Sequence, residues 1–148
     1  MTIGFFDSGV GGLTVLAEAL RQLPQEDYIY YADTEHVPYG IKSKDDVRRF
    51  VLQAVEFMAA QNIKALVVAC NTATSIAIKD LRQRYSFPVL GMEPAVKPAV
   101  EKNGSQKGSK RVLVAATPLT LTEEKYQDLV SRVDQDHIVD CIALPELV

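Results

Sequence analysis

Short apolar runs alternate with helix-forming patterns along this chain, and this alternation limits the fold more than any other feature of the sequence. Each run is short enough to be a buried strand, since parallel strands covered on both faces read as nearly continuous apolar stretches. Parallel neighbours need crossover connections, so the alternation predicts an α/β fold: an open, mostly parallel sheet with helices on both faces. The runs cover residues 3–6, 28–32, 65–69, 89–91, 112–116 and 138–144.

Three helices are predicted before residue 85, because apolar residues there recur at a spacing of three or four and so form one buried face. Two helix starts gain further support from capping boxes, in which a Ser or Thr precedes an acidic residue by three positions. Ser43 with Asp46 opens the second helix, and Thr120 with Glu123 precedes a helix over residues 124–133. The apolar stripes are Leu13, Leu16, Leu20 and Leu23; Val47, Val51, Ala54 and Met58; and Ala77, Ile78 and Leu81.

A polar break over residues 103–110 predicts a domain boundary near residue 100, because Gly, Ser, Lys and Gln replace the apolar rhythm there. Residues 1–100 would form a first α/β domain, and residues 101–148 the beginning of a second, similar one. The latter holds about two strands and one helix, which is too little for an independent core.

Composition excludes several classes of function. The formal net charge of -3 provides no basic field for a phosphate backbone, so nucleic acid is not an expected partner. No apolar run approaches the ~20 residues of a membrane span, and no leader pattern precedes the first strand, so we expect a cytoplasmic protein. Cys70 and Cys141 are the only cysteines and are expected to be reduced, with no disulfide framework and no metal site.

A glycine-rich loop follows the first predicted strand, with Asp7 and Ser8 leading into Gly9, Gly11 and Gly12. Amide groups at the next helix start favour a carboxylate or phosphate, and Asp7 can accept from an ammonium group. The alternative is a tight turn in which Asp7 or Ser8 is an ordinary cap. A nucleotide is disfavoured, because neither the dinucleotide glycine pattern nor a Gly-Lys-Ser/Thr sequence is present.

A second polar loop begins at Asp33 and Thr34 and contains Pro38, Tyr39 and Gly40. Loops at the carboxyl ends of parallel strands present groups to ligands, and here backbone groups and the Tyr39 hydroxyl are candidates. The alternative is that Pro38 and Gly40 simply form a turn and that Tyr39 covers the sheet edge.

Cys70 lies where the third predicted strand gives way to a helix, followed by Asn71 and Thr72. The helix dipole at such a position lowers the pKa of a thiol, which would suit a catalytic base. Asn71 and Thr72 offer donors and acceptors for a small polar substrate. The alternative is a buried structural cysteine beside an ordinary helix cap.

The remaining polar residues and the second cysteine give no clear sign of a catalytic role. Thr117 and Thr120 follow the fifth strand and offer hydroxyls, although capping of the next helix explains them equally well. His36 and His137 are expected on the solvated surface. Cys141 is expected to be a buried thiol inside the last apolar run.

Taken together, the segments Asp7-Ser8-Gly9-Val10-Gly11-Gly12, Pro38-Tyr39-Gly40 and Cys70-Asn71-Thr72-Ala73-Thr74 resemble the first-half motifs of glutamate racemases. The resemblance implies interconversion of L- and D-glutamate without a cofactor, which supplies D-glutamate for peptidoglycan. It implies that Cys70 is a catalytic acid/base and that the substrate glutamate is bound by Asp7, Ser8, Tyr39, Gly40, Asn71, Thr72 and Thr117.

The chain also departs from that family. Ala115-Ala116-Thr117 stands where members often have a Gly-Thr pair, and the Gly-Cys-Thr-His motif that carries the opposing thiol is missing. The resemblance therefore implies a fragment that is inactive alone and leaves apolar surface exposed, which a homodimer would cover. An aspartate or hydantoin racemase and a non-catalytic carboxylate-binding module remain alternatives.

Overall fold

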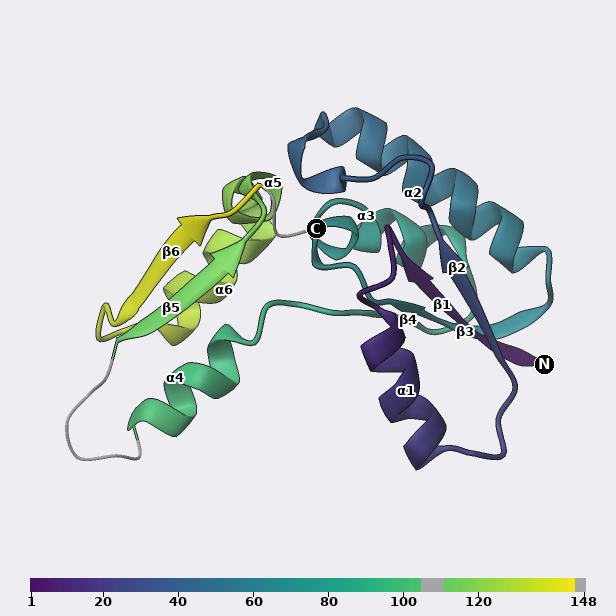
Figure 1. Cartoon of the computed structure of the whole chain (residues 1–148), viewed down its shortest axis with the longest axis horizontal. Helices are drawn as coiled ribbons and strands as arrows, with labels where there is room; N and C mark the ends of the chain where they lie inside the picture. The colour runs from purple at the N-terminus through teal and green to yellow at the C-terminus, as the bar shows by residue number, and fades with distance from the viewer. Residues whose placement is uncertain (105–110, 146–148) are drawn as a thin grey trace.

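The computed structural model describes residues 1–104 and 111–145, so most of the predicted linker, residues 105–110, lies outside the described part (Figure 1). All six predicted strands are confirmed, with small differences at their ends. The elements in chain order are β1 (Thr2–Asp7), α1 (Leu13–Gln22), β2 (Tyr28–Ala32), the 3-10 helix η1 (Tyr39–Ile41), α2 (Lys44–Ala59), β3 (Ile63–Val68), α3 (Asn71–Arg84), β4 (Val89–Gly91), α4 (Val96–Gly104), β5 (Val112–Ala116), α5 (Pro118–Thr122), α6 (Glu124–Val133) and β6 (Val139–Ala143).

The predicted α/β class is confirmed by a parallel sheet in the order β2-β1-β3-β4. Each neighbouring pair runs parallel, with β1 in register with β2 and β3. Figure 1 places α1 on the opposite side of this sheet from α2. The parallel order brings the carboxyl ends of the strands to one edge of the sheet, where ligand-binding loops of open α/β folds lie.

The main core lies between the sheet and the pair α2 and α3. The predicted stripe of α2 is buried as expected, with Val47, Val51 and Met58 fully inaccessible. These side chains pack against Phe6 and Leu66 of the sheet in one cluster. Burial of each such side chain stabilises the fold by about 1.5–3 kcal/mol, so this face fixes the positions of β1 and β3.

Helix α1 forms as predicted, but its apolar stripe is not buried. Leu13, Leu20 and Leu23 are 45%, 46% and 44% exposed, and the helix has no buried residue. The described residues cover this face only in part, since Leu16 is half-buried while the other three leucines are exposed. The expected exposure of apolar surface is thus confirmed here, whereas the homodimer stays a prediction.

The segment after β4 forms a second layered unit. Among the described residues, β5 and β6 pair in a separate parallel two-stranded sheet. A small cluster of Val96, Tyr126 and Leu129 joins α4 and α6 beneath it. The sequence patterns missed α4 because it contains Pro98, yet proline is tolerated in the first helical turn. Helix α4 spans the expected boundary near residue 100, which stays a prediction.

One of the two capping predictions is right and the other is wrong. The Ser43 side chain accepts from the Asp46 amide and caps α2, as expected. Thr120, in contrast, lies buried inside α5, whose cap is Thr117. Because Pro118 is preorganised for the first helical position, α5 begins before the predicted cap. Helix α6 starts at Glu124, and its N-cap, Glu123, makes no side-chain cap hydrogen bond.

Cys141 is exposed, so the expectation of a buried thiol is wrong. It lies on β6, which pairs only with β5 in the described sheet and therefore has one uncovered edge. Its Sγ lies 3.1 Å from the Tyr126 hydroxyl, so that neighbour is polar rather than apolar. None of the helices described over residues 1–104 and 111–145 has the length and apolarity to cross a membrane.

Candidate active site

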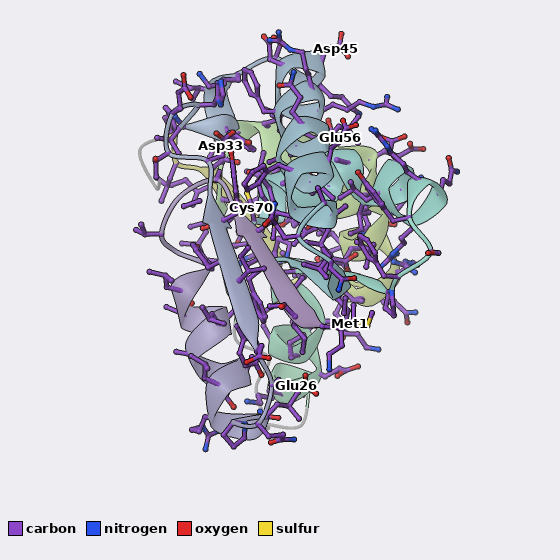
Figure 2. All side chains as sticks on the ribbon, turned by 90° about the vertical axis from the view of Figure 1, so that its right-hand side faces the viewer. Met1, Glu26, Asp33, Asp45, Glu56 and Cys70 are labelled. Carbon is purple, nitrogen blue, oxygen red and sulfur yellow. The ribbon has the colours of Figure 1, made fainter. Side chains whose placement is uncertain are left out.

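A cavity of about 650 Å³ opens at the carboxyl edge of the main sheet. Its walls are the loops that follow β1, β2 and β3, together with the end of β5 and the start of α5. Figure 2 shows Asp33 and Cys70 at the end of the sheet opposite Met1. All the predicted site residues line the cavity: Asp7, Ser8, Tyr39, Gly40, Cys70, Asn71, Thr72 and Thr117.

Cys70 is the N-cap of α3, and its Sγ accepts from the Ala73 amide at 3.4 Å. The Ser8 hydroxyl lies 3.4 Å from the same sulfur, so the thiol joins the loops after β1 and β3. Burial raises the pKa of the Cys70 thiol, while the hydrogen bonds with Ser8 and Ala73 act to lower it, and the nearby Asp7 carboxylate adds to the rise. The predicted lowering of this pKa is therefore wrong, because desolvation outweighs the helix start.

Asp7 holds its own loop in place. Its Oδ2 accepts from the Gly12 amide at 2.9 Å, which closes a tight turn. Gly12 is itself the N-cap of α1, which has no side-chain cap hydrogen bond, so the alternative in which Asp7 or Ser8 caps the helix is wrong. The Tyr30 hydroxyl donates to the Gly9 carbonyl at 2.9 Å and braces the loop from β2. Gly12 has to be glycine, because a Cβ there would lie 2.8 Å from the Ala69 Cβ. The loop thus turns tightly against β3 while Asp7 faces the cavity.

The Tyr39 hydroxyl donates to Asp33 Oδ2 at 2.5 Å, although the sequence made it a candidate for contact with the substrate. Burial raises the pKa of Tyr39, and the adjacent carboxylate adds to the effect. The other Asp33 oxygen lies 2.7 Å from Nδ1 of His36. His36 is half-buried and hydrogen-bonded, so the expectation of a solvated surface residue is wrong. Its position three residues after Asp33 was the one feature of the sequence that could have indicated this contact.

Three threonine hydroxyls meet on the far wall of the cavity. The Oγ1 of Thr72 lies 3.1 Å from that of Thr117 and 3.0 Å from that of Thr120, and the latter two are 3.0 Å apart. All three residues are buried. Each hydroxyl both donates and accepts, so the triangle joins α3 to α5 and leaves hydroxyl lone pairs at the cavity. Thr117 thus combines the capping and wall roles that the sequence left open, whereas Thr120 lies on the wall and caps no helix.

Two further contacts hold α5 against the first unit. A Cβ added at Gly40 would lie 2.3 Å from the Thr117 Cβ, so the backbone of η1 touches this side chain directly. Lys44 Nζ lies 2.6 Å from Oε2 of the buried Glu123. These contacts fix the width of the cavity between η1 and α5.

The family model described as Asp/Glu/Hydantoin racemase matches residues 7–148. The chain belongs to this racemase family. It is 65% identical over 148 residues to the glutamate racemase of Halothermothrix orenii, covering 100% of this chain and 57% of the relative.

Solved racemase structures have the same fold. The Escherichia coli glutamate racemase in complex with L-glutamate and the activator UDP-MurNAc-ala gives a TM-score of 0.88 at 32% identity, over 99% of this chain and 54% of that one. The Francisella tularensis enzyme in complex with D-glutamate gives 0.77 at 32% identity, over 95% and 51%. The chain spans about half the length of the relatives it matches.

Over residues 1–104 and 111–145, no group of three or more His, Cys, Asp or Glu residues is placed to hold a metal ion. The groups that line the cavity include the Cys70 thiol, the Asp7 carboxylate and several hydroxyl and amide groups.

Proposed function

We propose that this chain provides one half of the catalytic site of a cofactor-independent glutamate racemase, which interconverts L- and D-glutamate and supplies D-glutamate for peptidoglycan. The observation that carries the proposal is the Cys70 thiol, hydrogen-bonded to Ser8 at 3.4 Å on the wall of a cavity that also contains Asp7. The bound L- and D-glutamate of the two solved relatives support the choice of substrate.

Cys70 is proposed as the catalytic acid/base, and the substrate-binding residues are Asp7, Ser8, Tyr39, Gly40, Asn71, Thr72 and Thr117. Asp7 would accept from the substrate ammonium, while backbone amides and the Asn71 side-chain amide would donate to the substrate carboxylates. Thr72 or Thr117 would do so by turning its hydroxyl proton from the triangle towards the substrate. Tyr39 would act through its backbone, since its hydroxyl is already used by Asp33.

Racemisation needs a base on one face of the α-carbon and an acid on the other. A thiolate on one side takes the α-proton and becomes a thiol, and the electron pair left on carbon delocalises into the carboxylate. A thiol on the opposite side then gives its proton to carbon and becomes a thiolate. Because burial raises its pKa, Cys70 is suited to be the proton donor at neutral pH.

The described residues provide this chemistry on one face only. Cys141 does not line the cavity and lies on the exposed edge strand β6. We therefore propose that the chain binds glutamate but does not turn it over by itself. The reduced state that acid/base chemistry requires of Cys70 is consistent with a cytoplasmic location.

Exchange of the α-proton tests the catalytic part of this proposal. The chain is incubated with L- or D-glutamate in deuterated water, and deuterium at the α-carbon is followed by NMR together with optical rotation. We expect slow exchange of one enantiomer with retained configuration, because a single thiol removes and returns the proton on the same face. The exchange should rise with pH as the thiolate fraction grows.

Two variants make the exchange result decisive. Cys70→Ala should abolish exchange, and Cys141→Ala should leave it unchanged, because Cys141 lies outside the cavity. Equal exchange in the native chain and in Cys70→Ala would overturn the catalytic role. Glutamate binding without any exchange in the native chain would favour the alternative function, a non-catalytic carboxylate-binding module, which the presence of only one described thiol at the cavity supports.

Substrate choice within the family needs its own measurement, because the matching model covers aspartate, glutamate and hydantoin racemases. The dissociation constants of L- and D-glutamate, L- and D-aspartate and hydantoin are compared by NMR titration of the chain. Tightest binding of glutamate is expected, and tighter binding of aspartate or hydantoin would move the assignment to that branch of the family.

A further inference from the structure

A chain of hydrogen bonds runs from the half-buried His36 through Asp33 to Tyr39 at the cavity. Imidazole Nδ1 lies 2.7 Å from Asp33 Oδ1, and Asp33 Oδ2 accepts the Tyr39 hydroxyl at 2.5 Å. Asp33 and Tyr39 are only 5% and 1% exposed. Because the two oxygens belong to one rigid carboxylate, whatever orients the first also orients the second.

The direction of the bonds follows from the chemistry of the three groups. An ionised carboxylate only accepts hydrogen bonds, so the imidazole donates through Nδ1–H and the phenol donates through its hydroxyl. Hydrogen bonds to a charged acceptor are about twice as strong as neutral ones. His36 therefore restrains Asp33 from the solvent side, and Asp33 in turn restrains the Tyr39 ring.

His36 is also held by stacking, and this second contact must be separated from the first. Its ring lies 3.8 Å from the centroid of the Phe50 ring on α2, at an interplanar angle of 19°. The Arg49 guanidinium lies 4.9 Å from the same Phe50 centroid. The loop after β2 is thus attached to α2 by packing and to Tyr39 by hydrogen bonding.

We propose that His36 is a positioning residue for the substrate site: through Asp33 it fixes Tyr39, and with it the Tyr39–Gly40 backbone on the cavity wall. The inference rests on the proposed function for its substrate, glutamate. Gly40 lies directly against Thr117 on the cavity wall, so a shift of η1 would change the shape of the cavity. Small displacements of binding groups weaken ligand contacts steeply.

Two substitutions of His36 separate hydrogen bonding from stacking. In His36→Asn the side-chain amide occupies about the position of Nδ1 and keeps a donor to Asp33, while the aromatic stack on Phe50 is lost. His36→Phe keeps the stack and removes the donor. His137→Asn is a matched control, since His137 is exposed and its positive φ of 53° suits asparagine.

Two readouts are measured on the whole chain, after thermal unfolding has verified that each variant folds. The first is the hydroxyl proton resonance of Tyr39, assigned with Tyr39→Phe, which is protected from exchange while Asp33 accepts it. The second is the dissociation constant of glutamate, followed at the Gly40 amide by NMR. We expect His36→Phe to lose the hydroxyl resonance and to weaken binding on the order of tenfold.

The proposal is overturned if His36→Phe keeps both the resonance and native affinity, or if His36→Asn is as impaired as His36→Phe. The first result would make the hydrogen bond irrelevant, and the second would assign the effect to packing on Phe50. Native behaviour of His36→Asn and His137→Asn is expected. Should the native chain fail to bind glutamate at all, the proposed function fails, while the hydroxyl resonance still reports whether His36 positions Tyr39.

Discussion

The contact between Gly40 and Thr117 gives the most direct test of how the cavity is held together. In Gly40→Ala the new Cβ would lie 2.3 Å from the Thr117 Cβ, 2.5 Å from its Cγ2 and 2.9 Å from its Oγ1. Thr117 cannot turn aside without losing other bonds, because its Oγ1 caps α5 and bonds Thr72 and Thr120. The added methyl group therefore pushes η1 away from α5.

The magnitude follows from two opposing effects. Overpacking costs about 1–3 kcal/mol, and three contacts below 3.0 Å with a fixed neighbour put this site at about 3 kcal/mol. Replacing glycine with alanine also restricts the unfolded chain, which returns about 1 kcal/mol. The free energy of unfolding should fall by about 2 kcal/mol, and with a urea m-value of about 2 kcal/mol/M the midpoint should fall by about 1 M.

Urea unfolding followed by circular dichroism measures this loss, and Gly9→Ala is the matched control. Gly9 also lines the cavity, but a Cβ there meets only Val37 Cγ1 at 3.8 Å, an ordinary contact. Only the entropy effect remains, so Gly9→Ala should be neutral or stabilise by up to about 1 kcal/mol. Equal midpoints for the two variants would refute the argument, because the close approach of η1 to α5 would then carry no strain.

Three further outcomes are expected. Thr120→Val removes one hydroxyl of the threonine triangle and should lower the free energy of unfolding by about 1–3 kcal/mol. Thr122 is exposed, so the control Thr122→Val should change that free energy by less than about 0.5 kcal/mol. Similar losses in the two variants would show that the triangle does not stabilise the fold. Burial raises the pKa of the Cys70 thiol above its ordinary value of 9.0, so the protonated thiol stabilises the folded state below that value and the contribution is lost as pH rises through the folded pKa. Thermal midpoints between pH 8 and 10 should fall more steeply for the native chain than for Cys70→Ala, and parallel curves would contradict this. Tyr30→Phe removes the hydrogen bond to the Gly9 carbonyl and should lower the free energy of unfolding, measured in urea, by about 1 kcal/mol. The same variant should bind glutamate more weakly, and unchanged affinity would show that this hydrogen bond does not shape the site.

Features set by local sequence were predictable, and those set by distant partners were not. The six strands and the Ser43 cap depend on residues close in the chain, and all were found. The burial of α1 depends on what packs against it, and the described residues leave Leu20 exposed. Cys141 has an apolar neighbourhood in sequence but an edge position in space, which periodicity does not encode.

The site divides in the same way. The predicted site residues were expected at strand ends, and a parallel sheet necessarily brings strand ends together, so all of these residues line the cavity. The partners that hold them were beyond sequence reasoning. Thr72 and Thr117 are 45 positions apart, and nothing local indicates that their hydroxyls meet. The pKa of Cys70 was predicted in the wrong direction because the helix start is visible in sequence and the depth of burial is not.

The raised pKa of Cys70 bears directly on the proposed racemase chemistry. In the proposed reaction each thiol must be an acid in one direction and a base in the other, so its pKa cannot stay far above neutral when substrate is bound. Burial disfavours the Cys70 thiolate, and the Asp7 carboxylate adds to the effect. A bound amino acid brings an ammonium group that offsets the Asp7 charge, and its approach favours the thiolate for the same electrostatic reason. In the proposed reaction, the substrate's own ammonium group would therefore supply the charge that allows Cys70 to ionise.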